Sequence, residues 1–99
     1  MKTIGTILRE LREEKGLLLR EVGAKLSIDP TILSKIERDE RKATKTQIEA
    51  FSKFYKVKDE IYITWLSDKL VYEVKDEEFA LQAMQVAEEK IKYNKTLKK

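Results

Sequence analysis

The sequence of 99 residues contains no cysteine and no histidine, one proline and three glycines. Without cysteine and histidine the chain cannot build a zinc finger, and it has no Cys or His nucleophile and no His general base. The scarcity of proline and glycine, beside many Leu, Ile, Glu and Lys residues, favours an all-α fold. The lack of cysteine fits a reducing compartment, and we expect a cytoplasmic protein.

Several other features are missing. No apolar run approaches the length of a membrane span, and Met1 and Lys2 lead directly into a charged amphipathic helix, so no signal peptide is visible. No glycine-rich phosphate loop is present, and the serines have no base to activate them. Acidic pairs such as Glu13 and Glu14 are neighbours in sequence and indicate solvated helix faces. We therefore expect no enzyme, no cofactor, no metal site, no membrane contact and no small-molecule ligand.

Charge is distributed unevenly along the chain. Residues 1–58 contain 14 Lys and Arg against 9 Asp and Glu, whereas residues 59–89 contain two Lys against nine acids. Residues 90–99 add five Lys. A basic first half followed by an acidic segment indicates that only one end of the molecule meets a polyanion. Charge alone, however, favours an ordinary solvated surface, so the polyanion interpretation needs support from sequence motifs.

The stretch at residues 19–38 has the pattern of two short helices joined by a tight turn. Asp29 can cap the second helix, and Pro30 suits the first helical position, where its missing N–H costs nothing. Leu33 and Ile36 continue an inward-facing stripe of that helix. The residues left pointing outward are Thr31, Ser34, Lys35 and Arg38. This arrangement predicts a helix-turn-helix unit.

The stretch and its surroundings resemble the DNA-binding domain of the phage-repressor/Cro-like (XRE) helix-turn-helix family. The matching segments are LREEKGL at 11–17, EVGAKLSI at 21–28, ILSKIER at 32–38 and ERK at 40–42. The resemblance covers about residues 3–57. It implies an all-α protein, a five-helix repressor-like domain with a C-terminal helical extension. We place the DNA-binding domain at residues 1–58 and an extension for dimerisation at residues 59–99.

The resemblance also implies a partly buried structural ion pair between Arg12 and Glu37. The chain departs from the family pattern at Leu18 and Leu19, where the family has a small polar residue followed by Gln. It departs again at Asp39, where the family usually has Gly. Asp tolerates a left-handed backbone conformation less easily than Gly does, but better than most residues do.

DNA contacts follow from placing the helix that begins at Pro30 in a major groove, where its outward residues face base edges. The expected base contacts are Thr31, through its methyl or hydroxyl group, Lys35, as a donor to guanine, and Ser34, a shorter donor that can reach a phosphate instead. The expected phosphate contacts are Arg38, Arg41, Lys42, the backbone N–H of Thr44, and Lys45 at the rim. The alternative is a solvent-exposed helix with ordinary charges.

Two more helices are predicted at residues 59–72 and from Asp76 to about Tyr93, although the β-propensity of IYITW at 61–65 makes a strand conceivable there. Spare apolar residues in this half predict a dimer interface formed by Trp65, Leu66, Leu70, Phe79, Ala83, Met84, Ala87 and Ile91. The last helix is either this dimer face or a lid on the chain's own core. A two-fold dimer would place two recognition helices roughly 34 Å apart on a near-palindromic site.

Two functions remain open from the sequence. The first is a homodimeric, sequence-specific transcriptional regulator bound to double-stranded DNA, such as a controller protein, an antitoxin or a phage-type repressor. The second is a protein–protein interaction module that keeps the helix-turn-helix fold with weak or no DNA binding. Leu18 and Leu19 favour the second, because they offer only methyl groups at the expected phosphate edge.

Overall fold

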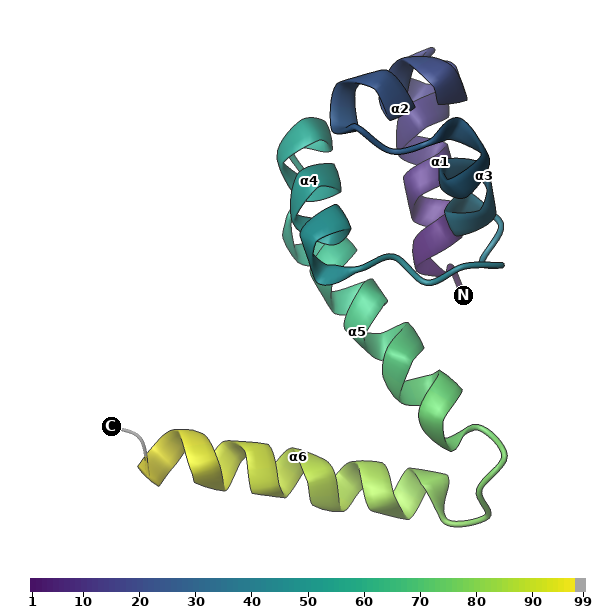
Figure 1. Ribbon diagram of the computed structural model, residues 1–99. Coiled ribbons are helices and arrows are strands. Elements are labelled where there is room, and N and C mark those ends of the chain that lie inside the picture. Colours follow the sequence, from purple (N-terminus) through teal and green to yellow (C-terminus); the bar gives the residue numbers. More distant parts are fainter. Residues whose placement is uncertain (98–99) are drawn as a thin grey trace. The chain divides into compact units, whose positions relative to one another are not determined.

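The computed structural model of the protein describes residues 1–97 and contains only helices and their connections in that range (Figure 1). The all-α prediction is therefore confirmed, and IYITW at 61–65 is helical. The described chain divides into two compact units, Met1–Lys69 and the part from Leu70 onward. The helices are α1 (Ile4–Glu14), α2 (Leu19–Leu26), α3 (Pro30–Glu37), α4 (Lys45–Tyr55), α5 (Asp59–Val74) and α6 (Ala80–Leu97).

Side chains near the helix ends explain where several helices begin. The Thr3 hydroxyl accepts a hydrogen bond from the Thr6 N–H at the start of α1. The Asp29 carboxylate accepts one from the Thr31 N–H, 2.7 Å away, at the start of α3. Each of these bonds satisfies a backbone donor that has no partner inside its helix. The sequence alone therefore determines these helix starts.

The core of the first unit is formed by all five of its helices. Its fully buried side chains are Leu8, Val22, Leu33, Ile36, Ile48, Phe51 and Ile61. Trp65 of α5 is only 6% exposed, and its indole Nε1 donates a hydrogen bond to the carbonyl oxygen of Ala43, 3.0 Å away. Since α5 contributes to this core, the first unit extends to Lys69, beyond the predicted boundary at residue 58.

Trp65 was wrongly assigned to the dimer interface. Its ring packs among the residues of the buried cluster, and its one polar atom is already bonded to Ala43. An aromatic side chain with this little exposed surface has almost none left for a partner to cover. The neighbouring Leu66, by contrast, is 50% exposed.

Two aspartates hold the first turn of α1. The N–H of Ile4 donates to Asp68 Oδ2 of α5 at 2.8 Å, and the N–H of Gly5 donates to Asp39 Oδ1 at 3.1 Å. A Cβ atom on Gly5 would lie 2.7 Å from the carbonyl oxygens of Ile36 and Glu37, so only glycine allows α1 to approach the end of α3 this closely. Both carboxylates also lie where the positive end of the helix dipole favours negative charge.

The second unit differs from expectation at both ends of α6. The helix begins at Ala80, because the segment after α5 makes tight turns in which the Glu77 N–H bonds to the Val74 carbonyl and the Ala80 N–H bonds to the Glu77 carbonyl. It continues to Leu97, four residues past the predicted end. The last two residues of the predicted extension, 98–99, lie outside the described part of the chain.

Candidate nucleic-acid interface

The turn between α2 and α3 fixes the orientation of α3. Ser27 ends α2 in a left-handed conformation, with φ of 55°, and Ile28 is buried immediately after it. A Cβ atom on Gly23 would lie 2.6 Å from the carbonyl oxygen of Ile28, so glycine lets α2 pass directly over the turn. Helix α3 lies against both α1 and α2 (Figure 1). The sequence therefore builds a helix-turn-helix unit with a firmly seated second helix.

Helix α3 divides cleanly into a buried and an outward side. Leu33, Ile36 and Glu37 are buried, and Ser34 is half-buried. The exposed residues of this segment include Thr31 and Lys35 within α3 and Arg38 at its end. Two of the three residues expected to contact bases, Thr31 and Lys35, are thus accessible, whereas Ser34 offers only part of its side chain.

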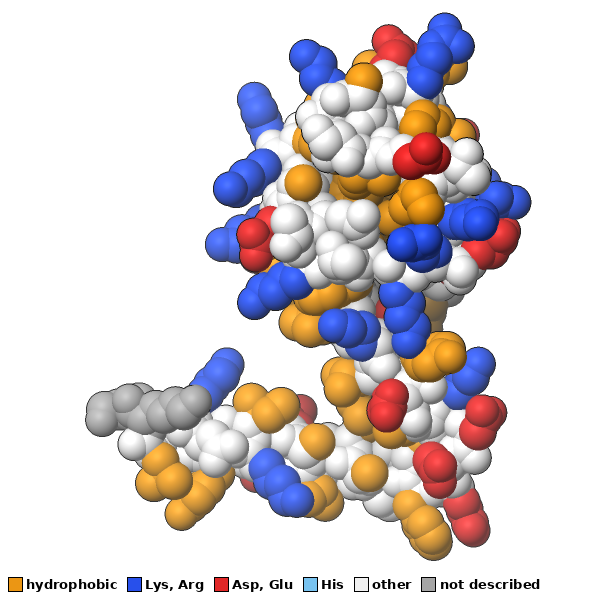
Figure 2. Space-filling model, viewed as in Figure 1, with side chains coloured by type: hydrophobic (Ala, Val, Ile, Leu, Met, Phe, Trp, Pro, Cys, Tyr) orange, Lys and Arg blue, Asp and Glu red, His pale blue; other side chains and the backbone are white. Residues whose placement is uncertain are grey.

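The residues predicted to contact phosphates lie at the end of α3, in the following loop and at the start of α4. Arg41, Lys42 and Lys45 are exposed. Arg38 is also exposed, but its guanidinium lies 3.1 Å from the Glu40 carboxylate, so a phosphate would have to compete with that group. In the view of Figure 2, Lys and Arg side chains predominate over acidic ones on the first unit.

The structure corrects the role predicted for Thr44. Its backbone N–H donates to Gln47 Oε1 at 3.0 Å, and the Gln47 N–H donates back to the Thr44 hydroxyl at 3.1 Å. This reciprocal cap uses the N–H that was expected to hold a phosphate. The next two backbone N–H groups, of Lys45 and Thr46, are the first-turn donors that have no acceptor inside α4.

Beneath this surface, Arg12 of α1 and Glu37 of α3 form an ion pair. Arg12 Nε lies 2.9 Å from Glu37 Oε2, and Arg12 Nη2 lies 3.0 Å from Glu37 Oε1. The remaining guanidinium nitrogen, Nη1, donates to the carbonyl oxygen of Leu17 at 2.9 Å. The hydrogen bonds to Glu37 raise the pKa of Arg12 above its ordinary value. One side chain thus joins α1, α3 and the segment that leads into α2.

Comparison with known families supports the geometry. A family model described as Helix-turn-helix matches residues 8–61, more than half of the chain. The chain belongs to the XRE helix-turn-helix family. The resemblance found in the sequence is confirmed by this match, and the members of this family are DNA-binding regulators. Comparison with curated proteins and with solved structures gave no match.

Two features of this XRE-family domain were missed from the sequence. Asp39 was noted only as a departure from Gly, but it adopts the expected left-handed conformation, with φ of 60°, and its carboxylate also bonds the Thr3 hydroxyl and the Gly5 N–H. The second feature is the buried hydroxyl of Tyr55 in α4. No helix among the described residues has the length and apolar character needed to cross a membrane.

The Tyr55 hydroxyl has no hydrogen-bond partner among the described residues, although it is buried. Burial, with a smaller contribution from the negative charge of Glu37, raises the pKa of Tyr55 from 10.0 to about 12. Between about pH 10 and about pH 12 the folded protein therefore keeps a proton that the unfolded chain has already released. This group therefore does not change the free energy of unfolding below about pH 10, and it lowers that free energy as the pH rises from about 10 towards about 12, because the folded protein disfavours the buried phenolate.

Replacing Tyr55 with phenylalanine is expected to raise the free energy of unfolding at pH 7 by about 1 kcal/mol, because it removes a buried hydroxyl that has no partner. It should also reduce the loss of stability on going from pH 10 to pH 12. Urea denaturation at a series of pH values measures both effects. Tyr72→Phe is the control, since Tyr72 is 57% exposed and should leave both nearly unchanged. A destabilised Tyr55→Phe protein would show that the hydroxyl makes a favourable interaction.

Proposed function

We propose that this protein is a sequence-specific transcriptional regulator that binds a near-palindromic operator as a homodimer. The observation that carries the proposal is the placement of α3, whose buried side is fixed in the core while Thr31 and Lys35 are exposed. In a major groove these two residues, with the accessible part of Ser34, would contact bases. The expected phosphate contacts are Arg38, Arg41, Lys42, Lys45 and the first-turn N–H groups of α4.

The homodimer is proposed because one helix-turn-helix unit contacts few base pairs, and pairing two units doubles the site. A partner would cover apolar residues that the chain leaves in solvent, among them Leu66 and Leu70, which are about half exposed. The other proposed interface residues are Phe79, Ala83, Met84, Ala87 and Ile91. Phe79 and Ile91 are more than half exposed, and Met84 and Ala87 are partly covered.

The proposed orientation is tested by comparing Lys35→Ala with Arg41→Ala. Loss of Lys35 should relax preference at particular base positions, at a cost of roughly 1–3 kcal/mol in discrimination. Loss of Arg41 should weaken binding to all duplexes alike and reduce the salt dependence by about one unit, because one phosphate contact disappears. Selection of bound duplexes from a random pool and mobility-shift titrations across salt concentrations provide the two readouts.

Lys53→Ala is a matched control for this comparison, since Lys53 is an exposed lysine on α4 outside the proposed surface. It should change neither the base preference nor the salt dependence. If Lys35→Ala and Arg41→Ala give the same specificity profile, the proposed orientation of α3 in the groove is wrong.

The second candidate function is a protein–protein interaction module with the same fold. Leu18 supports it, because this residue is 48% exposed where the family has a polar residue. Leu19 supports it less, since its side chain packs against the core and is only partly exposed. A mobility-shift titration with random duplex as competitor separates the two functions. If random duplex abolishes binding at every salt concentration, the result favours the interaction module.

A further inference from the structure

Helix α6 is 18 residues long, and none of its residues is buried in the described chain. Apolar side chains nevertheless recur along this helix, beginning with Phe79, which immediately precedes it. Phe79 is 66% exposed, Val86 53%, Tyr93 63% and Leu97 64%. Most of the stability of a helix in a protein comes from packing an apolar face, so such a helix requires a covering surface.

These four residues lie on a heptad repeat, whereas two further exposed apolar residues of α6, Leu81 and Ile91, do not. Alternating steps of four and three residues connect Phe79, Ala83, Val86, Lys90, Tyr93 and Leu97, which we call the α6 seam. This spacing is that of the contact line between two helices in a coiled coil. On the adjacent line Met84 and Ala87 are partly covered and Ile91 is 56% exposed, whereas every residue of the α6 seam is exposed.

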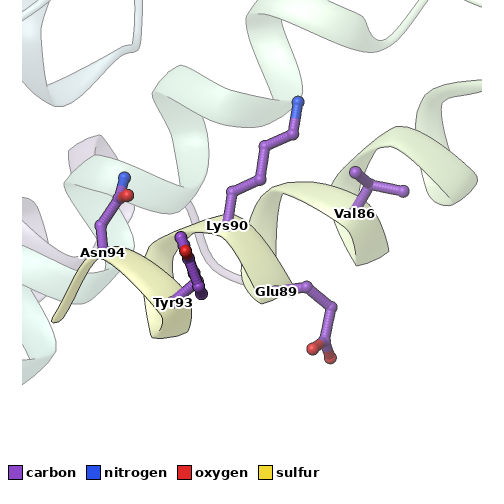
Figure 3. A pocket seen from close by; sticks show the side chains of 5 residues that line it. All are labelled: Val86, Glu89, Lys90, Tyr93 and Asn94. Atoms are coloured by element: carbon purple, nitrogen blue, oxygen red, sulfur yellow. The ribbon is translucent and has the colours of Figure 1, made fainter. Parts of the chain in front are cut away.

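The shape of the helix surface agrees with this spacing. An open depression lies in the middle of the seam and is lined by Val86, Glu89, Lys90, Tyr93 and Asn94 (Figure 3). The first four are at positions i, i+3, i+4 and i+7, the four residues that form the hole for one knob of a partner helix. No residue of another element lines it among those described. The depression therefore leaves room on this face of α6 for a side chain of a second helix.

We propose that the occupant of the α6 seam is the same helix of a second copy, running antiparallel. When two copies are aligned antiparallel about a point near residue 88, every seam residue meets a seam residue. Phe79 then faces Leu97 of the second copy, Ala83 faces its Tyr93, and Val86 faces its Lys90. The smallest side chain lies opposite one of the largest, which fills space evenly along the contact. This pairing rests on the homodimer proposed above. Of the interface residues proposed there it keeps Phe79 and Ala83 in the contact, and it leaves Met84, Ala87 and Ile91 off the seam.

Lys90 selects this orientation over the parallel one. In a parallel pair the two Lys90 ammonium groups would oppose each other in the seam, and Ala83 would face Ala83 and leave a gap. In the antiparallel pair the aliphatic stem of Lys90 packs on Val86, while its charged end lies near the two Glu89 carboxylates that approach the two-fold axis. A single lysine at a seam position is a known way of specifying register at some cost in stability.

The absence of cysteine from the sequence allows a direct test by disulfide cross-linking of the full chain. The double variant Ala83→Cys/Tyr93→Cys should form a covalent dimer under mild oxidation, seen as a doubled mass on a non-reducing gel and reversed by reductant. The two positions are ten residues apart in one helix, or about 15 Å, which is too far for a disulfide within one chain. Ala83→Cys alone should stay monomeric on the gel, since its two copies are also about 15 Å apart in the antiparallel pair.

The matched control is Gln85→Cys/Lys95→Cys, which has the same ten-residue separation on the opposite face of α6 and should not cross-link. Equal cross-linking of this control would show random collisions and overturn the proposal. Efficient cross-linking of Ala83→Cys alone would show a parallel pair and overturn it as well.

Sedimentation and a mobility-shift titration of the same samples separate this proposal from the proposed function. A double variant that sediments as a dimer without cross-linking would place the interface elsewhere, with Leu66 and Leu70 of α5 as the first candidates. That result overturns the α6 pairing and leaves the homodimer standing. Cross-linking without any DNA binding would support the pairing and overturn the regulator.

Discussion

Replacing Glu37 with glutamine is expected to lower the free energy of unfolding by about 3–5 kcal/mol, because the Arg12 guanidinium would remain buried without its counter-charge. The Arg12 side chain is only 13% exposed and that of Glu37 only 3%. Glutamine keeps the size of the side chain and part of its hydrogen bonding, so the loss measures the charge pair rather than packing. Urea denaturation of the two proteins at neutral pH gives the difference directly.

Glu40→Gln is the matched control for this experiment. Glu40 also pairs with an arginine, Arg38, but both side chains are more than half exposed. Exposed pairs contribute at most about 1 kcal/mol, so this variant should unfold almost like the original protein. Equal and small effects of the two substitutions would mean that the Arg12–Glu37 pair does not hold α1 against α3.

Replacing Trp65 with alanine is expected to lower the free energy of unfolding by about 3–5 kcal/mol as well. The substitution leaves a cavity in the core of the first unit and removes the hydrogen bond from the indole to the Ala43 carbonyl. Because Ala43 lies in the loop between α3 and α4, the damage should reach the region proposed to contact phosphates. Thermal and urea denaturation, followed by circular dichroism, measure the loss.

Leu66→Ala provides the comparison, since Leu66 is the next residue on α5 and is half exposed. It should change stability by less than about 1 kcal/mol at low protein concentration, where a surface substitution has little to disrupt. If the Trp65→Ala protein unfolded as reversibly as the Leu66→Ala protein and at the same temperature and urea concentration, α5 would not belong to the core of the first unit.

Local chemistry made much of the first unit predictable from the sequence. Asp29 followed by Pro30 determines the start of α3, and Thr44 with Gln47 determines the start of α4, since capping depends only on neighbouring residues. The alternation of apolar and polar positions in α3 separates Leu33 from Lys35 in the same local way. These elements carry most of the candidate site, which explains why its exposed residues were predictable.

Contacts between residues far apart in the sequence were not predictable in this way. Trp65 is a large apolar residue at the same helical spacing as its exposed neighbours, so the sequence does not separate it from an interface residue. Only its contact with Ala43 in the folded protein shows that it belongs to the core. The Thr44 N–H was predicted to hold a phosphate, but Gln47, three residues further along, supplies its acceptor. The end of α6 was misjudged because polar residues near a terminus carry little helix-stopping information without glycine or proline.

The Asp39 carboxylate has a thermodynamic consequence for whatever the neighbouring loop binds. It bonds the Thr3 hydroxyl and the Gly5 N–H, so the chain that leaves α3 is fastened to the beginning of α1. The conformational entropy of this loop is therefore surrendered when the protein folds, not when a ligand arrives. A surface ordered in advance loses little freedom on association, and more of each contact that it makes appears as affinity.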